Sequence, residues 1–479
     1  MKLLKSKYAN IINNKWINSN STFQVKNPLT NETLSIVSSC TKTQLKEAIK
    51  SSQNAFLKWK KLSIKKRSTY LINLFNLIKE NTEDLAEIIV LEQGKPISEA
   101  IAEINYANAF ITSAVNAGLQ LKGEILYSHF ENKQGHVYNE PYGVIGCITP
   151  WNFPAAMITR KIAPALITGN TVILKPSELT PLTALALGEL AIKAGFPVGI
   201  LNIVCGDALK ISDMILAHND IKKISFTGST KTGKSLLDRS STTITKLSLE
   251  LGGHAPFIVF DDADIELAIT AAIQSKFRNC GQTCICANRF YIQDNIYPAF
   301  IELLHTKIKE LNLGNGLDNK THLGPLINQN AIKKIEDQIN DALEKGATLI
   351  CGGKKYNHKK FPNAHFFEPT ILTNCTATMK VFTEETFGPI CAIKQFKTES
   401  GIINEANNSI YGLAAYAFTT NLKRTFNLSK ELNYSIIGIN DGTPSHTEIP
   451  FGGFNQSGMG KEGGSYALAE YTQQKYVSL

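Results

Sequence analysis

Long apolar runs are missing from this sequence. A run of about 18 apolar residues, the length that crosses a bilayer, occurs nowhere. The opening segment MKLLKSKYANIINNKW also has no apolar region of the kind that directs export. We therefore expect a cytoplasmic protein that neither spans nor binds a membrane.

Clustered charge is also scarce. Lys and Arg number 50 against 41 Asp and Glu, for a net charge of +9, but they are scattered, and even the densest run, 58–67, fits a solvated helix face. We expect no nucleic-acid partner. The 43% hydrophobic and 19% charged content is typical of a globular protein, and 479 residues exceed what one core accommodates, so two or three domains are expected.

Histidine is absent around the densest group of cysteines. Cys280, Cys284 and Cys286 are spaced by four and two residues, which is not the Cys-x-x-Cys spacing of zinc sites, so we expect no metal. Because the thiols of such a protein should stay reduced, a reactive thiol is the better interpretation. Gly281, Gln282 and Thr283 precede Cys284 without hydrophobic periodicity and predict a polar turn, which makes Cys284 the candidate nucleophile. The other six cysteines are expected to be small buried residues: Cys40, Cys147, Cys205, Cys351, Cys375 and Cys391.

A helical periodicity dominates 42–121, with helices predicted over 45–59, 68–93 and 97–115 that pack and support without chemistry of their own. Residues 122–141 turn polar and irregular and predict a hairpin that leaves the main body.

Strand and helix alternate in the next part of the chain, which predicts an α/β fold with a doubly wound parallel sheet. Strands are predicted over 144–149, 171–174, 201–205 and 221–226, and helices over 154–168, 180–195, 208–217 and 231–239. Such a sheet binds ligands beyond the carboxyl ends of its strands. Polar motifs follow three of the strands, at 150–154, 175–178 and 227–230, and Pro154 is placed to begin a helix.

One motif favours a different function. Residues 228–235, GSTKTGKS, match the phosphate loop G-x-x-x-x-G-K-[ST], and the apolar run 257–261 ends in an acid that could bind magnesium, as in a nucleoside triphosphatase. The alternative is a glycine turn that opens a helix beside a pyrophosphate, in which the backbone and Ser229 matter and Lys234 is a surface residue.

Glu250 ends an apolar run before Gly252 and Gly253. Burial would raise the pKa of its carboxyl group towards that of a general base, although a carboxylate that accepts a neighbouring backbone amide is equally compatible.

The motifs PWNFP, KPSE, FTGST, ELGG and GQTC, in this order, resemble the aldehyde dehydrogenase superfamily from about Trp16 to the C-terminus. The resemblance implies a Rossmann-like cofactor domain (1–121 and 142–252), an α/β catalytic domain (253–442) and a β-strand oligomerisation arm with bridging segments (122–141 and 443–479). It also implies a homodimer or homotetramer.

The same resemblance implies a mechanism. Cys284 adds to an aldehyde carbonyl, the Asn152 amide and the Cys284 backbone N–H stabilise the oxyanion, and Glu250 activates water against the thioester. Lys161 and Glu462 are implied as proton-relay helpers. The implied cofactor-binding residues are Trp151, Lys175, Glu178, Gly228, Ser229, Glu385 and Phe387. Because the Glu178 carboxylate would repel a 2′-phosphate, we expect NAD in preference to NADP, with NADP possible.

Two arginines suggest the substrate. Arg160 and Arg278 could hold a carboxylate, and the segments ITRK and SKFRNCGQTCICAN resemble succinate-semialdehyde dehydrogenases, where a serine, here Ser445, assists. Another ω-carboxy aldehyde such as glutarate semialdehyde, or two arginines paired with surface acids, stays open. The resemblance also implies that Cys286, or else Cys280, forms a regulatory disulfide with Cys284.

Overall fold

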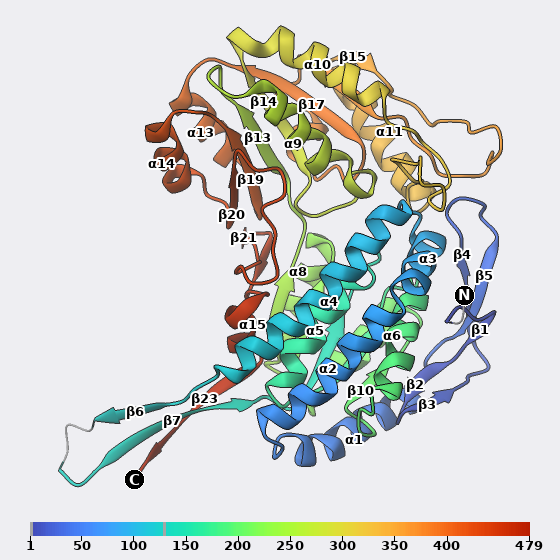
Figure 1. The fold of residues 1–479 in the computed structure, drawn as a ribbon, viewed down its shortest axis with the longest axis vertical. Helices are drawn as coiled ribbons and strands as arrows, with labels where there is room; N and C mark the ends of the chain where they lie inside the picture. Colours follow the sequence, from blue (N-terminus) through green and yellow to red (C-terminus); the bar gives the residue numbers. More distant parts are fainter. Residues whose placement is uncertain (1–2, 128–130) are drawn as a thin grey trace.

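Two large β-sheets, each covered by helices, form the body of the protein, and a narrow β-arm extends from it (Figure 1). The computed structural model describes residues 3–127 and 131–479. The remaining part of the predicted hairpin, 128–130, lies outside the described residues.

The first sheet confirms the predicted doubly wound α/β arrangement. Its strand order is β22 (Gly458–Met459), β12 (Lys246–Glu250), β11 (Ile221–Thr227), β8 (Val144–Ile148), β9 (Thr171–Lys175), β10 (Leu201–Ile203), β2 (Asn10–Ile12) and β3 (Lys15–Ile17). The strands from β12 to β10 pair in parallel, and the others pair antiparallel at the two edges. The chain runs from β8 outward to β10 and then returns to β11 on the other side of β8. This reversal places the switch point, where such sheets bind ligands, between β8 and β11.

The crossover helices of this sheet lie close to the predicted ranges: α5 (Ala156–Ile167), α6 (Pro181–Lys193), α7 (Ala208–Leu216) and α8 (Thr230–Ser240). The prediction that Pro154 begins α5 is wrong, because the helix begins at Ala156 and Ala155 is its N-cap. The side chain of Ala155 cannot cap the first amides of α5, so those amides need acceptors from elsewhere.

The predicted helical region forms α1 (Lys42–Trp59), α2 (Ile64–Glu80), α3 (Thr82–Gln93) and α4 (Ile97–Leu119). The single helix predicted over 68–93 is divided at Asn81, whose φ of −110° and ψ of 22° end α2. The Asn81 side chain donates to Leu77 O at 2.7 Å, a local bond that competes with the helix. Before these helices lies a small sheet of β1 (Lys7–Tyr8), β5 (Thr33–Ser38) and β4 (Thr22–Lys26).

The second sheet has the strand order β15 (Thr348–Cys351), β16 (Thr370–Thr373), β17 (Ile390–Phe396), β14 (Ala287–Gln293), β13 (Ala255–Val259), β19 (Ala414–Phe418) and β20 (Ile436–Ile439). Its pairs are parallel except at β15. The helices of this part are α9 (Ile265–Phe277), α10 (Tyr297–Lys309), α11 (Gln329–Glu344), α12 (Lys380–Thr383), α13 (Glu399–Asn407) and α14 (Leu422–Glu431), with short 3₁₀ turns at Arg278–Gly281 and Asp294–Ile296.

The C-terminal segment connects all parts of the molecule. In it, β21 (Phe454–Asn455) pairs with β18 (Tyr411–Gly412), β22 joins the first sheet, and α15 (Gly464–Glu470) leads into β23 (Thr472–Ser478). The arm consists of β6 (Glu124–Tyr127) and β7 (Gln134–Pro141), with β23 paired to β7, and the C-terminus lies on it (Figure 1). This agrees with a hairpin in 122–141, whereas the domain boundaries stay a prediction.

No helix within 3–127 and 131–479 combines the length and apolar character needed to cross a membrane.

Candidate functional site

A cavity of about 340 Å³ opens at the switch point of the first sheet and reaches the second. It is lined by Pro150, Trp151, Asn152, Met157, Thr227, Gly228, Ser229, Leu251, Gly252, Cys284, Ile327, Asn328, Asn330, Ala331, Lys334, Glu385, Thr386 and Phe387. Seven of the predicted site residues therefore share one cavity: Trp151, Asn152, Gly228, Ser229, Cys284, Glu385 and Phe387. Their individual roles stay predictions.

The turn that carries Cys284 has an unusual backbone. Asn279 and Cys280 both adopt the left-handed region, with φ of 51° and 54°. A non-glycine residue in this region is costly unless its surroundings hold it there. Gly281 has a φ of 75°, and a Cβ there would lie 2.3 Å from Gly388 O, so only glycine fits. The first residue of the motif GQTC, Gly281, thus lies where its backbone packs closely against the backbone of Gly388.

Cys284 is half-buried in the cavity wall. Burial raises the pKa of its thiol to about 12, and the nearby charges of Glu385 and Glu250 act in the same direction, while Arg160 and Arg278 oppose them. Activation of this thiol therefore stays a prediction, and its raised pKa means that a base should assist removal of its proton.

Glu250 ends β12 and is buried, as its sequence predicted. Burial raises the pKa of its carboxyl group well above the usual range, and the charge of Glu462 adds to this, while Lys161 and Arg160 oppose it. Neither carboxyl oxygen has a hydrogen-bond partner within the described residues. This geometry favours a proton acceptor over a carboxylate that binds a backbone amide.

The two glycines after Glu250 bring the strand against the catalytic turn. A Cβ at Gly253 would lie 2.3 Å from Cys284 O, and the Gly253 amide donates to Glu385 Oε1 at 3.0 Å. The motif ELGG therefore brings its own Glu250 and the residues Cys284 and Glu385 of other segments into one part of the site.

Asn152 lies in the turn between β8 and α5 and is buried. Its Nδ2 donates to Gln282 O at 3.0 Å. Because an amide carries two N–H bonds, one donor remains for an oxyanion.

Glu462 lies between two buried cations. Its Oε1 accepts a hydrogen bond of 2.5 Å from Lys161 Nζ, and its Oε2 lies 3.0 Å from Arg160 Nε. Lys161 also donates to Ser225 at 3.1 Å. The predicted pair Lys161 and Glu462 is thus in direct contact, and Arg160 joins it.

Arg160 pairs with an acid, but the acid is buried, not at the surface as the alternative interpretation expected. Its guanidinium packs over the rings of Phe110 and Phe451, at 4.7 and 4.2 Å from their centroids. Among the described residues, Arg160 Nη2 is a buried donor without a hydrogen-bond partner. A substrate carboxylate would satisfy it.

The other two predicted substrate residues lie in different settings. Arg278 is half-buried and stacks over Phe153 at 4.9 Å. Ser445 shares a hydrogen bond of 2.9 Å with the hydroxyl of Tyr106 on α4. Neither borders the main cavity, so their contact with substrate stays a prediction.

The end of the cavity at β11 suits a dinucleotide. Ser229 caps α8 and is exposed, so the helix N-terminus faces the cavity with its amides. Trp151 and Phe387 flank this end of the cavity with ring centroids 5.6 Å apart, and the half-buried Glu385 places a carboxylate in the cavity wall. Burial raises the pKa of Glu385, which Lys334 on α11 opposes. Sequence reasoning missed Lys334 because the pattern of its helix indicates only that this position faces solvent.

Lys175 ends β9, and Glu178 lies in the segment that follows this strand. Lys175 is buried and forms an ion pair of 2.9 Å with Glu178, whose side chain is 46% exposed. Glu178 borders a second hollow that shares Ile327 and Asn328 with the main cavity.

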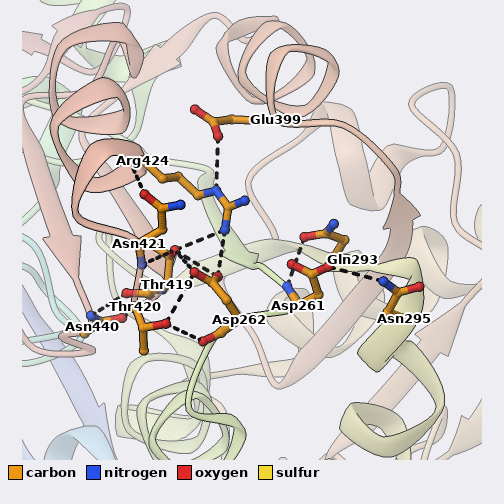
Figure 2. A network of polar contacts seen from close by, with 10 residues as sticks. All are labelled: Asp261, Asp262, Gln293, Asn295, Glu399, Thr419, Thr420, Asn421, Arg424 and Asn440. Atoms are coloured by element: carbon orange, nitrogen blue, oxygen red, sulfur yellow. Dashed lines mark hydrogen bonds and ion pairs between the residues drawn. The ribbon is translucent and has the colours of Figure 1, made fainter.

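The phosphate-loop interpretation is wrong. The helix begins at Thr230, so most of GSTKTGKS is helical and cannot wrap a phosphate, and Lys234 is exposed. Asp261 follows β13 in the other sheet and accepts from Asn295 at 3.2 Å, and its amide donates to Gln293 (Figure 2). The adjacent Asp262 binds Arg424 at 2.7 Å, in a network that ties β13 to β19 and α14.

The remaining cysteines are free thiols. Cys280 and Cys286 are buried, and Cys286 Sγ donates to Lys276 O at 3.6 Å, so a disulfide with Cys284 stays a prediction. The prediction of burial is confirmed for Cys147, Cys205, Cys375 and Cys391, whereas Cys40 and Cys351 are half-buried. In the described part of the chain, no three His, Cys, Asp or Glu side chains are grouped to hold a metal.

The helices expected to lack chemistry, α3 and α4, and the loop between them contribute a polar cluster beneath the site. Its members Gln93, Lys95, Glu99 and Glu103 contact the segments around Asn152 and Asn279. Sequence periodicity missed them because it treats such residues as part of a solvated face.

Known proteins provide a comparison for the whole chain. It is 45% identical over 471 residues to the Escherichia coli succinate-semialdehyde dehydrogenase [NADP(+)] GabD, with 98% of this chain and 97% of the relative covered. It is 43% identical over 470 residues to the glutarate-semialdehyde dehydrogenase of Pseudomonas putida, with 98% and 97% covered. A crystal structure of succinate-semialdehyde dehydrogenase from Burkholderia pseudomallei superposes with a TM-score of 0.97 at 42% identity, over 100% of this chain and 98% of that one. The sequence model described as the aldehyde dehydrogenase family matches residues 16–477. The chain therefore belongs to the aldehyde dehydrogenase family.

Proposed function

We propose that this protein oxidises succinate semialdehyde to succinate with a nicotinamide dinucleotide as hydride acceptor. The observation that carries this proposal is Cys284 in the wall of a cavity shared with Asn152, with Glu250 and Arg160 buried nearby. Glutarate semialdehyde, longer by one methylene, is the alternative. The similarity to the glutarate-semialdehyde dehydrogenase of P. putida supports this alternative.

The first half of the reaction forms a thioester on Cys284. Glu250, whose pKa is raised by burial, accepts a proton from the thiol, and the sulfur adds to the aldehyde carbon. The free N–H of Asn152 and the backbone N–H of Cys284 donate to the resulting oxyanion. A nicotinamide dinucleotide, when bound, would supply the acceptor for the hydride that leaves this carbon, and Trp151, Ser229 and Glu385 would hold it in the cavity.

The second half releases the product. Glu250 removes a proton from water, the hydroxide adds to the thioester carbonyl, and the Cys284 thiolate departs and is reprotonated. Per turnover, the aldehyde, one water and the oxidised cofactor yield the carboxylic acid, the reduced cofactor and one proton. Lys161 and Glu462, in contact with each other beside Arg160, are suited to pass the proton away from Glu250.

The substrate carboxylate provides the test of specificity. Arg278→Ala should raise the KM for succinate semialdehyde by about 30- to 150-fold, because a charge-assisted hydrogen bond contributes about 2 to 3 kcal/mol. The KM for butanal, which has no carboxylate, should change less than about 3-fold. Arg278 suits this test better than Arg160, whose removal would also leave Glu462 without one cation.

Arg424→Ala is the matched control, because this arginine binds Asp262 and Glu399 away from the cavity (Figure 2). It should leave both KM values unchanged. Equal losses on both aldehydes in Arg278→Ala would refute a carboxylate clamp.

We also propose NAD as the preferred cofactor, although the E. coli relative is named for NADP(+). The exposed carboxylate of Glu178 would repel a 2′-phosphate, and its ion pair occupies the buried Lys175. Glu178→Gln should therefore raise kcat/KM for NADP by about 10-fold, since one removed charge contact contributes about 1.4 kcal/mol, and should leave NAD less favoured. Steady-state kinetics with both cofactors measures the change. An unaltered ratio of kcat/KM for NADP to kcat/KM for NAD would show that Glu178 does not select between the two cofactors.

The arm fits association with further copies of this chain. Ile125, Leu126, Tyr138 and Tyr476 are exposed on it, and β6 and β23 are edge strands of its sheet. Apolar side chains beside open strand edges are typical of an interface, which supports a homodimer or homotetramer.

A further inference from the structure

The cluster of Gln93, Lys95, Glu99 and Glu103, in which Glu99 is half-buried and the other three are buried, contacts both the turn of Asn152 and the turn before Cys284. Lys95 and Glu103 have fully buried side chains and form an ion pair of 2.6 Å. A buried ion pair is a poor source of stability, because removing two charges from water costs several kcal/mol per ion. Its presence here calls for a reason other than stability.

The first contacts of this pair are with the segment that carries Asn152. Lys95 Nζ donates to Asn152 O at 2.9 Å and lies 3.9 Å from the centre of the Phe153 ring. Glu103 Oε1 accepts from the amides of Ala155 and Ala156 at 2.8 and 3.3 Å. These are the amides at the start of α5, where the N-cap side chain provides no acceptor. The pair therefore holds the turn between β8 and α5 at two points, Asn152 and the start of α5.

The second contacts are with the strained turn before Cys284. Glu99 Oε2 accepts from the Asn279 amide at 2.8 Å, and Gln93 Nε2 donates to Asn279 Oδ1 at 2.8 Å. Asn279 Nδ2 in turn donates to Asn152 O at 3.0 Å, so Lys95 and Asn279 share one acceptor. These bonds hold the left-handed backbone of Asn279 and Cys280, which would otherwise relax.

We propose that Lys95, assisted by Gln93, Glu99 and Glu103, is a positioning residue that aligns the Asn152 amide with Cys284 by fixing both turns from below. This inference rests on the proposed function. An oxyanion donor acts only if it is placed where the charge develops, so a small displacement of Asn152 lowers kcat without changing cofactor binding.

A double-mutant cycle tests the coupling. Lys95→Met should lower kcat for succinate semialdehyde by about 10- to 100-fold and leave the KM for the cofactor unchanged. In an Asn152→Ala background the same substitution should lower kcat by less than about 2-fold, because Lys95 acts through Asn152. Losses that multiply would overturn the proposal. If Lys95→Met does not fold, the same cycle is measured with the milder Gln93→Leu, which should lower kcat by about 3- to 10-fold.

Lys223→Met is the matched control, since it removes an equally buried lysine whose partners are Ser248 and Glu470. It should show no coupling to Asn152→Ala. Alkylation of Cys284 by iodoacetamide develops no oxyanion, so it should proceed at the same rate in Lys95→Met and wild type. If Lys95→Met slowed alkylation as much as it lowers kcat, Lys95 would act on the thiol and not through Asn152.

Hydrogen exchange separates failure of this inference from failure of the proposed function. Lys95→Met should speed amide exchange in 151–156 and 279–284 by about 10-fold, whereas Lys223→Met should not, whether or not the wild type oxidises an aldehyde. If the wild type oxidises none, the proposed function is wrong. Unchanged exchange in both segments would mean that Lys95 positions neither turn.

Discussion

Cys284→Ala should lower kcat for every aldehyde by about 10⁴-fold or more, because no other group can form the thioester. The substitution removes one half-buried sulfur, so the fold and the cofactor site, formed mainly by other segments, should persist. Steady-state assays together with the thermal midpoint and the Kd of the dinucleotide measure these effects.

Cys205→Ala serves as the control for Cys284→Ala, because this thiol is buried in the first sheet domain away from the cavity. It should retain wild-type turnover. Substantial aldehyde oxidation by Cys284→Ala would remove Cys284 from the mechanism.

Glu250→Gln should lower kcat by about 10²- to 10⁴-fold, the usual contribution of a general base. If thiol addition can still use another base, the thioester forms once per site and then hydrolyses slowly. Rapid mixing should then show a burst of one reduced cofactor per subunit followed by a slow phase. Glu405→Gln, which loses only a half-buried pair with Lys394, should behave as wild type.

The pH profile tests the same residue. Burial raises the pKa of Glu250, and the base acts only when deprotonated, so wild-type kcat should fall as pH drops through a value above the ordinary carboxyl range. Activity at higher pH should also gain from ionisation of Cys284, whose pKa is raised to about 12. The acid limb should be missing from Glu250→Gln, and its persistence there would assign it to another group.

Local sequence predicted the parts of this site that depend on local geometry. Gly253 follows Glu250 because a Cβ would strike Cys284 O, and Ser229 follows β11 because it caps α8. Such requirements leave a motif in a short stretch. The parallel strands are likewise predicted by apolar runs between amphipathic helices, and the observed strands lie close to these runs.

Other features depend on residues far apart in the chain, which no local pattern encodes. Arg160 obtains its partner Glu462 from the C-terminal segment. The Asn152 turn is held by Glu103 from α4 and by Lys95 from the loop before α4, a region whose periodicity predicts only packing. The raised pKa of Cys284 is likewise a result of burial by several segments. These long-range contacts had to come from the structure.

The most direct measurement is the formation of reduced nicotinamide when the purified protein is mixed with NAD and succinate semialdehyde, with butanal in a parallel assay. The proposed reaction predicts one reduced cofactor and one succinate per aldehyde consumed, with kcat/KM higher for the semialdehyde. No reduced cofactor with either aldehyde, using NAD or NADP, would contradict it.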